Sequence, residues 1–263
     1  MIIQRMALGV RYDGTAYHGW QRQDGLKTVQ GELERALGAI ADHPINLVCA
    51  GRTDSGVHAT AQVVHFNTEV ERTDYSWIFG ANSNMAKDIS VSWAQKVDME
   101  FHARFSATYR RYRYIIYNHP TRPAIMRHSV TWYHRPLNEQ KMQEAANFLL
   151  GEHDFSSFRG ANCQANSPIR KIENITVTRH HYLVIVDVLA NAFLHHMIRN
   201  IVGVLLPIGE GQRPVSWMPE ILALKNRQEG GATAVPNGLY LVEVGYPSHY
   251  NLPRMPVGPF FLH

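Results

Sequence analysis

Two glycines enclose one carboxylate in the stretch Gly51-Arg52-Thr53-Asp54-Ser55-Gly56-Val57-His58-Ala59, which follows the apolar run Ile45-Asn46-Leu47-Val48-Cys49-Ala50. An apolar run that is bounded by turn residues predicts a strand leading into a tight loop. Such a loop presents Asp54 at the rim of a sheet, and the nearby Arg52 favours the ionised carboxylate. An ionised, positioned carboxylate can act as a nucleophile or a general base. A glycine turn with a solvated aspartate is the competing interpretation, so the rest of the chain must decide.

The composition is that of an ordinary globular protein, with 45% hydrophobic and 18% charged residues in a chain of 263. This length suits one large domain or two α/β halves. No apolar run approaches the roughly 18 residues of a membrane span, and the N-terminal residues lack a signal-peptide layout. Cys49 and Cys163 are far apart in sequence and suggest no disulfide framework. We therefore expect a cytoplasmic protein without a membrane segment.

The basic residues favour a nucleic-acid partner. The formal net charge is +4, and 20 of the 26 basic residues are arginine. Arginine offers a planar fork of donors that suits phosphate and stacks on bases, whereas lysine is a hydrated point charge. This balance is typical of a nucleic-acid-binding protein but does not establish one.

The hydrophobic pattern predicts strands and helices in alternation. Helices are expected at Val29–Ile40, capped by Thr28, after Asn138 up to Gly151, at His195–Ile208 and at Ser216–Asn226. The helix after Asn138 would bury one face made of Met142, Ala145, Ala146, Leu149 and Leu150. Strands are expected at Ala7–Tyr12, Ala61–Asn67, Ile89–Val97, Arg111–Asn118, Ile169–Val177, Tyr182–Leu189 and Leu239–Gly245, with Arg179-His180-His181 at a hairpin turn.

This pattern predicts an α+β fold of two α/β halves, with mainly antiparallel sheets and helices on one side. The first half would cover residues 1–120 and the second residues 121–263, with a weak boundary at Thr121-Arg122-Pro123. No long linker or low-complexity stretch separates the halves.

A second informative segment, Phe101-His102-Ala103-Arg104-Phe105-Ser106-Ala107-Thr108-Tyr109-Arg110-Arg111-Tyr112-Arg113-Tyr114, interleaves arginines with aromatic residues. On a strand, Arg110, Tyr112 and Tyr114 would share one face, and Arg111 and Arg113 the other. A face with rings beside guanidinium groups can stack an unpaired base and hold its phosphates. An aromatic strand that packs on a core is the alternative, and it applies more to Tyr114 than to Tyr112.

A third segment, His195-His196-Met197-Ile198-Arg199-Asn200, begins the predicted helix at His195–Ile208. His196, Arg199 and Gly203 would align on one face of this helix. A partly buried arginine needs an anion, and Asp54 is a candidate for Arg199. The adjacent histidines point in different directions on a helix and lack further ligands, so we predict no metal site.

Other cofactor and nucleophile motifs are missing from the sequence. There is no Walker loop, and Gly14-Thr15-Ala16-Tyr17-His18-Gly19 has the wrong spacing for a dinucleotide fingerprint. No serine stands in a nucleophile elbow. We therefore expect no cofactor.

Taken together, these motifs resemble the tRNA pseudouridine synthase A (TruA) family over nearly the full chain. The resemblance rests on Gly-Arg-Thr-Asp-x-Gly-Val-His-Ala at residues 51–59, Arg-Arg-Tyr-Arg-Tyr-x-Ile at 110–116, and His-His-Met-x-Arg-Asn at 195–200. Ser55 departs from the more familiar alanine, and residues 82–89 lack an expected Leu-Pro pair, which puts the rigidity of that segment in doubt.

The resemblance implies roles for individual residues. Asp54 would be the nucleophile, Arg199 its paired arginine, and Tyr112 the residue that stacks on the target uracil. Arg52 would contact RNA near the flipped base, and Leu239 would line the pocket. Further RNA contacts are implied at Phe101, His102, Ala103, Arg104, Phe105 and Arg110, and at Asn162, Cys163, Gln164, Ala165 and Asn166.

The resemblance also implies the reaction and the assembly. The family isomerises uridine to pseudouridine at positions 38, 39 and 40 of the tRNA anticodon stem-loop. By this resemblance the two α/β halves of the chain join around a basic cleft, and the family acts as a homodimer that binds one tRNA across both subunits and needs no cofactor. An RNA-binding module without catalysis and a nucleoside hydrolase are the competing functions, although ordinary glycoside hydrolysis generally uses two carboxylates.

Overall fold

The computed structural model describes residues 3–262, which form two compact units. Unit 1 combines the chain up to Thr108 with the segment from Tyr240 onward, and unit 2 runs from Tyr109 to Leu239. This division differs from the predicted boundary at residue 120, because the Tyr112 strand groups with the later segment and the C-terminal segment returns to unit 1. Met1, Ile2 and His263 lie outside the described residues.

Unit 1 is built on a sheet with the strand order β4, β1, β3, β10. Strand β1 (Gln4–Tyr12) pairs antiparallel with both β4 (Ile89–Val97) and β3 (His58–Thr68). Strand β10 (Leu239–Gly245) lies parallel to β3, with Tyr240 opposite His58. The short strand β2 (Val48–Cys49) pairs antiparallel with β3, so the predicted strand at Ile45–Ala50 is confined to two residues.

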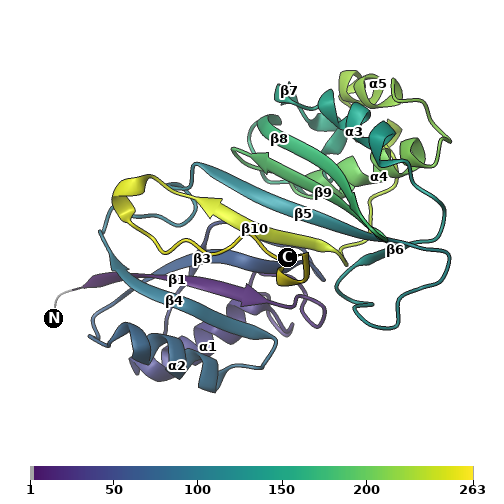
Figure 1. Ribbon diagram of the computed structural model, residues 1–263. Coiled ribbons are helices and arrows are strands. Elements are labelled where there is room, and N and C mark those ends of the chain that lie inside the picture. The colour runs from purple at the N-terminus through teal and green to yellow at the C-terminus, as the bar shows by residue number, and fades with distance from the viewer. Residues whose placement is uncertain (1–2, 263) are drawn as a thin grey trace. The chain divides into compact units, whose positions relative to one another are not determined.

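Two helices of unit 1 lie next to each other on one face of this sheet (Figure 1). Helix α1 (Val29–Ala41) begins as predicted after Thr28, whose hydroxyl accepts a hydrogen bond from the Gly31 N–H. Helix α2 (Asp74–Asn84) was not predicted, and it contributes only Trp77 and Ala81 to the buried interior. The core between sheet and helices contains large side chains such as Trp20, Leu33, Leu37, Phe66 and Trp77.

Unit 2 is built on a sheet with the strand order β5, β9, β8, β7. Its strands β5 (Tyr109–Asn118), β9 (Leu183–Ala190), β8 (Ile169–His180) and β7 (Gly151–Asp154) pair antiparallel, while β6 (Thr131–Tyr133) runs parallel to β5. The β8–β9 hairpin extends further than predicted. His180 still belongs to β8, and the turn is at His181, whose φ is +53°.

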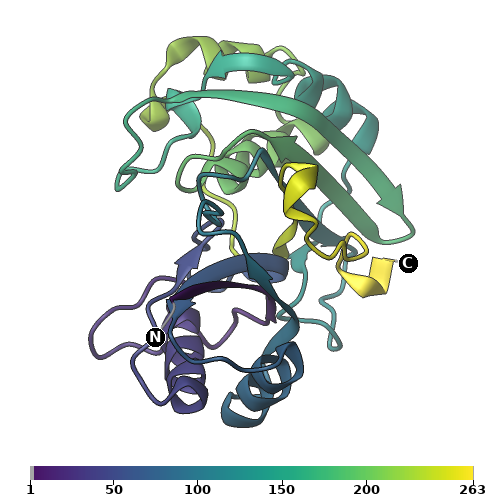
Figure 2. The same cartoon turned by 90° about the vertical axis from the view of Figure 1, so that its left-hand side faces the viewer.

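Three helices cover one face of this second sheet (Figures 1 and 2). They are α3 (Glu139–Asn147), α4 (Met197–Gly209) and α5 (Trp217–Leu224). Asn138 caps α3 as predicted, but the helix ends at Asn147, so Leu149 and Leu150 lie beyond it. Helix α4 begins at Met197, two residues after the approximate start predicted at His195, because His196 has a φ of +61° and precedes the first helical residue.

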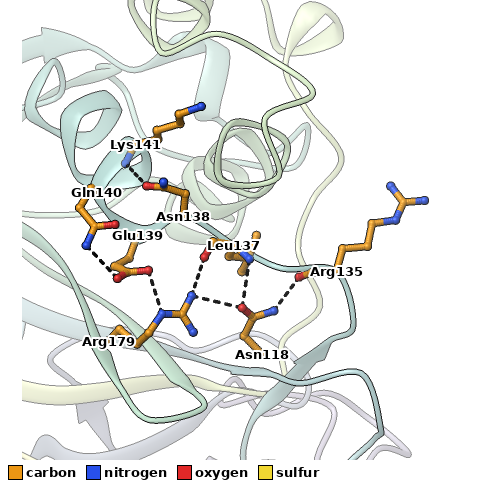
Figure 3. A network of polar contacts seen from close by, with 8 residues as sticks. All are labelled: Asn118, Arg135, Leu137, Asn138, Glu139, Gln140, Lys141 and Arg179. Carbon is orange, nitrogen blue, oxygen red and sulfur yellow. Dashed lines mark hydrogen bonds and ion pairs between the residues drawn. The ribbon is translucent and has the colours of Figure 1, made fainter.

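A polar network ties the ends of strands β5 and β8 to the start of helix α3 (Figure 3). The Asn118 carboxamide donates to the carbonyls of Tyr133 and Arg135 and accepts from the Leu137 N–H. Arg179 of β8 donates to the Leu137 carbonyl at 2.6 Å and forms an ion pair with Glu139 at 2.8 Å. These contacts fix the connection between β6 and α3 on the sheet.

The two units together confirm the predicted α+β class, with mainly antiparallel pairing and helices on one face of each sheet. Within residues 3–262, no helix combines the length and the apolar character that crossing a membrane requires.

Candidate functional site

The Asp54 loop, defined here as residues 50–57, connects β2 to β3 in unit 1. It closes as a tight turn in which the Val57 N–H donates to the Asp54 carbonyl at 3.1 Å, and Gly56 adopts a φ of +77°. Thr53 is buried, Asp54 is half-buried and Arg52 is exposed. The structure therefore contains the strand, glycine turn and partly accessible carboxylate that the sequence predicts.

The segment after β1 packs closely against this loop. The Trp20 N–H donates to the Thr53 carbonyl at 3.0 Å, and the Ser55 hydroxyl donates to the Tyr17 carbonyl at 3.0 Å. Gly19 has a φ of +86°, and a Cβ atom there would lie 2.8 Å from the Thr53 oxygen. Only glycine fits this approach without strain, so the loop backbone is held against a rigid neighbour.

The next predicted RNA-contact segment divides between core and surface. Phe101 and Ala103 are fully buried, so their side chains contribute to the core of unit 1 and not to its surface. His102 accepts the N–H groups of Arg104 and Phe105 at 3.2 and 3.1 Å, and its ring stacks on Phe105. The Arg104 guanidinium lies 5.5 Å from the centre of the Phe105 ring, which is 75% exposed. Three side chains of this segment thus form an aromatic and cationic surface.

Strand β5 of unit 2 carries the predicted alternation of side chains. Tyr112 is largely buried, and its ring meets Phe193 edge to face at 5.0 Å. Arg110 donates to the Asn191 carbonyl at 3.1 Å. Tyr114 is fully buried and donates to the Val235 carbonyl at 2.7 Å, and burial raises the pKa of its phenol. Tyr114 therefore follows the alternative interpretation, that of a core residue.

The other face of β5 contains an ion-pair cluster that the sequence analysis missed. Both oxygens of Asp187 on β9 accept from Arg111, at 2.7 and 2.9 Å, and Arg113 donates to one of them at 2.7 Å. Asp187 is only 6% exposed. The signal in the sequence is a single acidic residue within the apolar strand Leu183–Ala190.

Arg199 lies in the first turn of α4 and is half-buried. Its Nε donates to the Ala234 carbonyl at 2.7 Å, and its own carbonyl accepts the Ala234 N–H at 3.1 Å. The neighbouring Asn200 is fully buried and donates to the Phe158 carbonyl at 2.8 Å. Because His196 precedes the helix, it does not continue the predicted stripe of Arg199 and Gly203. An ion pair between Arg199 and Asp54 stays a prediction.

The remaining predicted site residues lie in unit 2. Leu239 is the first residue of β10 and is 5% exposed, and its role in lining a pocket stays a prediction. In the loop at residues 162–166, Arg159 donates to the carbonyls of Cys163 and Ala165, both at 2.8 Å. Burial acts against ionisation of the Cys163 thiol, but the N–H groups of Ala165 and His195 together with the Arg159 guanidinium outweigh it, so the thiol pKa is lowered. Asn162, Gln164 and Asn166 are exposed.

Comparison with known proteins gives a consistent result. A sequence model described as tRNA pseudouridine synthase matches residues 9–106 and 145–247. The tRNA pseudouridine synthase A of Coxiella burnetii is 59% identical over 258 residues, which is 98% of this chain and 99% of that protein. The proteins of the same name from Shewanella loihica and another Shewanella strain are 57% and 56% identical over the same shares. Arg52, Asp54, Arg199 and Leu239 fall within the two matched ranges, and Tyr112 falls between them.

Proposed function

Because this chain belongs to the tRNA pseudouridine synthase family, we propose that Asp54 is the nucleophile with which it isomerises uridines of the tRNA anticodon stem-loop. The family assignment makes the protein an isomerase that converts uridine to pseudouridine in tRNA. We further propose that the targets are tRNA positions 38, 39 and 40, and that the protein acts as a homodimer in the cytoplasm. The main support for Asp54 as the nucleophile is its position. It is a half-buried carboxylate on a glycine turn, and hydrogen bonds from the segment after β1 hold the backbone of this turn.

The reaction breaks the glycosidic C–N bond and joins the same uracil to the sugar through carbon. Reactant and product have the same atoms, so the balance requires no group donor. A carboxylate can begin this rearrangement by attacking the anomeric carbon, by attacking the base, or by removing a ribose proton. Each route requires an anionic Asp54 at a fixed position, and the loop geometry supports all three equally.

The target base must leave its stack to reach a carboxylate, which costs a few kcal/mol. Stacking on Tyr112 would return about 1–3 kcal/mol of that cost. In this proposal Leu239 adds an apolar wall, and Arg199 pairs with Asp54. The Tyr112–Phe193 contact supports the stacking role, because it holds the Tyr112 ring edge to face and limits its rotation.

The proposed RNA contacts are mostly exposed groups that suit phosphate or base. They are Arg52, Arg104, Phe105, Asn162, Gln164 and Asn166, together with the more buried His102, Arg110, Cys163 and Ala165. Arginine contacts to phosphate release counterions, so tRNA affinity should fall steeply as salt rises. A flat salt response would argue against this surface as the tRNA site.

The proposal is tested by incubating the protein with unmodified tRNA, digesting to nucleosides and mapping pseudouridine. We expect pseudouridine at positions 38, 39 or 40, with loss of more than about 10³-fold in rate for Asp54→Asn and little change in tRNA affinity. Undiminished modification by Asp54→Asn would contradict the proposed nucleophile. Release of free uracil would instead identify a hydrolase, and binding without modification would identify an RNA-binding module.

A further inference from the structure

The side chain of Gln62 on strand β3 forms hydrogen bonds to the start of the Asp54 loop with both ends of its carboxamide. Its Nε2 donates to the Gly51 carbonyl at 2.6 Å, and its Oε1 accepts from the Gly51 N–H at 3.3 Å. We call this pair of hydrogen bonds the Gln62 clasp. The side chain is completely buried. One side chain therefore satisfies both polar backbone groups of the residue that lies three positions before Asp54.

This clasp stands where the regular strand pairing ends. The Ala50 N–H still donates to the Val63 carbonyl at 2.8 Å, as in a strand ladder. At Gly51 the chain turns toward Asp54, and the Gln62 carboxamide takes the place of a partner strand. At Gly51, which is partly buried, the carboxamide pairs both backbone groups, so the loop can leave the sheet at a defined residue without leaving these groups unpaired.

A second contact links the clasp to the residue directly before Asp54. The Gln62 Nε2 lies 3.4 Å from the Tyr12 hydroxyl, which in turn lies 2.7 Å from the Thr53 hydroxyl. Tyr12 and Thr53 are both buried. The carboxamide thus acts on the loop at two points, directly at Gly51 and through Tyr12 at Thr53.

We propose that Gln62 is a positioning residue for Asp54, fixing the backbone from which the carboxylate reaches the target nucleotide. This inference rests on the proposed role of Asp54 as nucleophile. Gln62 itself contacts no reacting group in this proposal, and its effect passes through Gly51 and Thr53. A displacement of about 1 Å at a reacting group can reduce a rate about 10²-fold, so a buried amide behind the loop can govern the chemical step.

The first experiment separates chemistry from binding. Gln62→Met keeps the volume of the side chain but removes both hydrogen-bonding ends. We expect the single-turnover rate of pseudouridine formation at saturating tRNA to fall about 10²-fold, while tRNA affinity changes less than about threefold. A wild-type rate in folded Gln62→Met would overturn the inference, and so would a loss confined to tRNA affinity.

Asn82 offers a matched control in the same unit. Its carboxamide also forms hydrogen bonds to both backbone groups of one residue. It accepts from the Val91 N–H at 2.7 Å and donates to the Val91 carbonyl at 3.0 Å. These two hydrogen bonds join α2 to β4, and none of the hydrogen bonds described above for the Asp54 loop comes from either element. Asn82→Leu is expected to lower thermal stability while leaving the single-turnover rate unchanged. An equal loss of rate in both variants would reduce Gln62 to a general structural role.

A third variant tests the donor directly and remains informative if Gln62→Met fails to fold. Gln62→Glu keeps the shape but replaces the Nε2 donor with an oxygen that repels the Gly51 carbonyl. Burial raises the pKa of such a carboxyl group, and its protonated form can donate again. Tyr12 is the titratable side chain that the structure places against this position. The rate relative to wild type should therefore rise about 10-fold as the pH falls through the titration of this carboxyl group, followed by NMR in the same variant, and a constant ratio across that titration would overturn the inference.

Asp54→Asn distinguishes the two proposals. Loss of activity in Asp54→Asn, together with a normal rate in the Gln62 variants, would contradict the positioning role alone. Full activity in Asp54→Asn would contradict the proposed nucleophile and remove the premise for Gln62.

Discussion

Asp54 in unit 1 and Asp187 in unit 2 differ in burial and in what fixes their positions. Asp187 is buried, and its two oxygens accept three hydrogen bonds from Arg111 and Arg113. Asp54 is half-buried on a loop whose backbone is held by neutral groups, among them the Trp20 N–H and the Gln62 carboxamide. Arginine side chains hold the Asp187 carboxylate, whereas the contacts described for the Asp54 loop hold its backbone.

The surroundings of Asp54 and Asp187 show two ways in which a protein can hold a carboxylate. A carboxylate whose oxygens are committed to arginines stabilises a strand pair but has little capacity left for a substrate. In the Asp54 loop, neutral groups hold the backbone that carries the carboxylate, so the main chain sets the position from which the carboxylate extends. Changes at Asp187 should therefore affect mainly stability, and changes around the Asp54 loop should affect mainly the rate.

The largest stability effect is expected for Asp187→Asn. Removing this charge leaves two arginines at a buried position without their anion, and breaking a buried pair in this way costs about 3–5 kcal/mol. Urea unfolding should show this loss in the free energy of unfolding. The matched change Asp54→Asn is expected to cost less than about 1 kcal/mol, because that site is partly solvated. Equal losses in the free energy of unfolding for the two variants would contradict the proposed difference between Asp187 and Asp54.

The second effect is a loss of stability in acid that arises in unit 1. His65 is buried and accepts the Ala103 N–H at 3.0 Å, and burial, with the charges of Arg5 and His102, lowers its pKa from 6.5 to about 4. The unfolded chain therefore binds a proton below about pH 6.5, whereas folded His65 does so only near pH 4. The free energy of unfolding should fall by about 3 kcal/mol across this window and remain unaffected by His65 above it.

His65→Asn supplies the comparison for this prediction, since an asparagine oxygen can accept the Ala103 N–H without titrating. Urea unfolding from pH 7 to pH 4 should give a smaller acid loss in this variant than in the wild type. Identical pH profiles would show that His65 is not the group responsible.

Local patterns predicted those parts of the fold that depend on neighbours in sequence. Thr28 and Asn138 cap their helices, and β4 and β10 have the predicted bounds, because caps and alternation are properties of a few consecutive residues. Helix α2 escaped prediction because it buries only Trp77 and Ala81 while Tyr75 and Phe79 are exposed, so it lacks a clear apolar stripe.

The candidate site also could be predicted only where it depends on residues that are neighbours in sequence. The loop, its glycines and its carboxylate follow from one continuous stretch, but the partners that fix it come from other strands. Gln62 reaches Gly51 across a strand pair, and Asp187 reaches Arg113 only in the register that β5 and β9 adopt. Motif reasoning also placed Phe101 among the RNA contacts, whereas packing buries it. Register and burial are tertiary properties, so the sequence pattern alone does not determine them.

For Gly19→Ala we expect a smaller loss of stability than for Asp187→Asn, together with a loss of reaction rate. Alanine at a φ of +86° is strained, and its Cβ would lie 2.8 Å from the Thr53 oxygen, so the Asp54 loop must shift. We expect a stability loss of about 2 kcal/mol and a fall of about 10-fold in single-turnover rate. Gly25→Ala is the control, because its φ is +73° but no atom lies within 4 Å of the added Cβ. A rate loss at Gly25 as large as at Gly19 would contradict the contact argument.

The smallest effect isolates a single neutral contact of the Asp54 loop. The Tyr12 and Thr53 hydroxyls lie 2.7 Å apart and are buried, and a hydrogen bond of this kind contributes about 1 kcal/mol. A double-mutant cycle of Tyr12→Phe and Thr53→Val, measured by urea unfolding, should give a coupling energy of that size. Because the contact joins two uncharged groups, the coupling should be the same in low and high salt. A coupling that weakens with salt would show that charge contributes to holding the Asp54 loop, and the contrast with Asp187 would then fail.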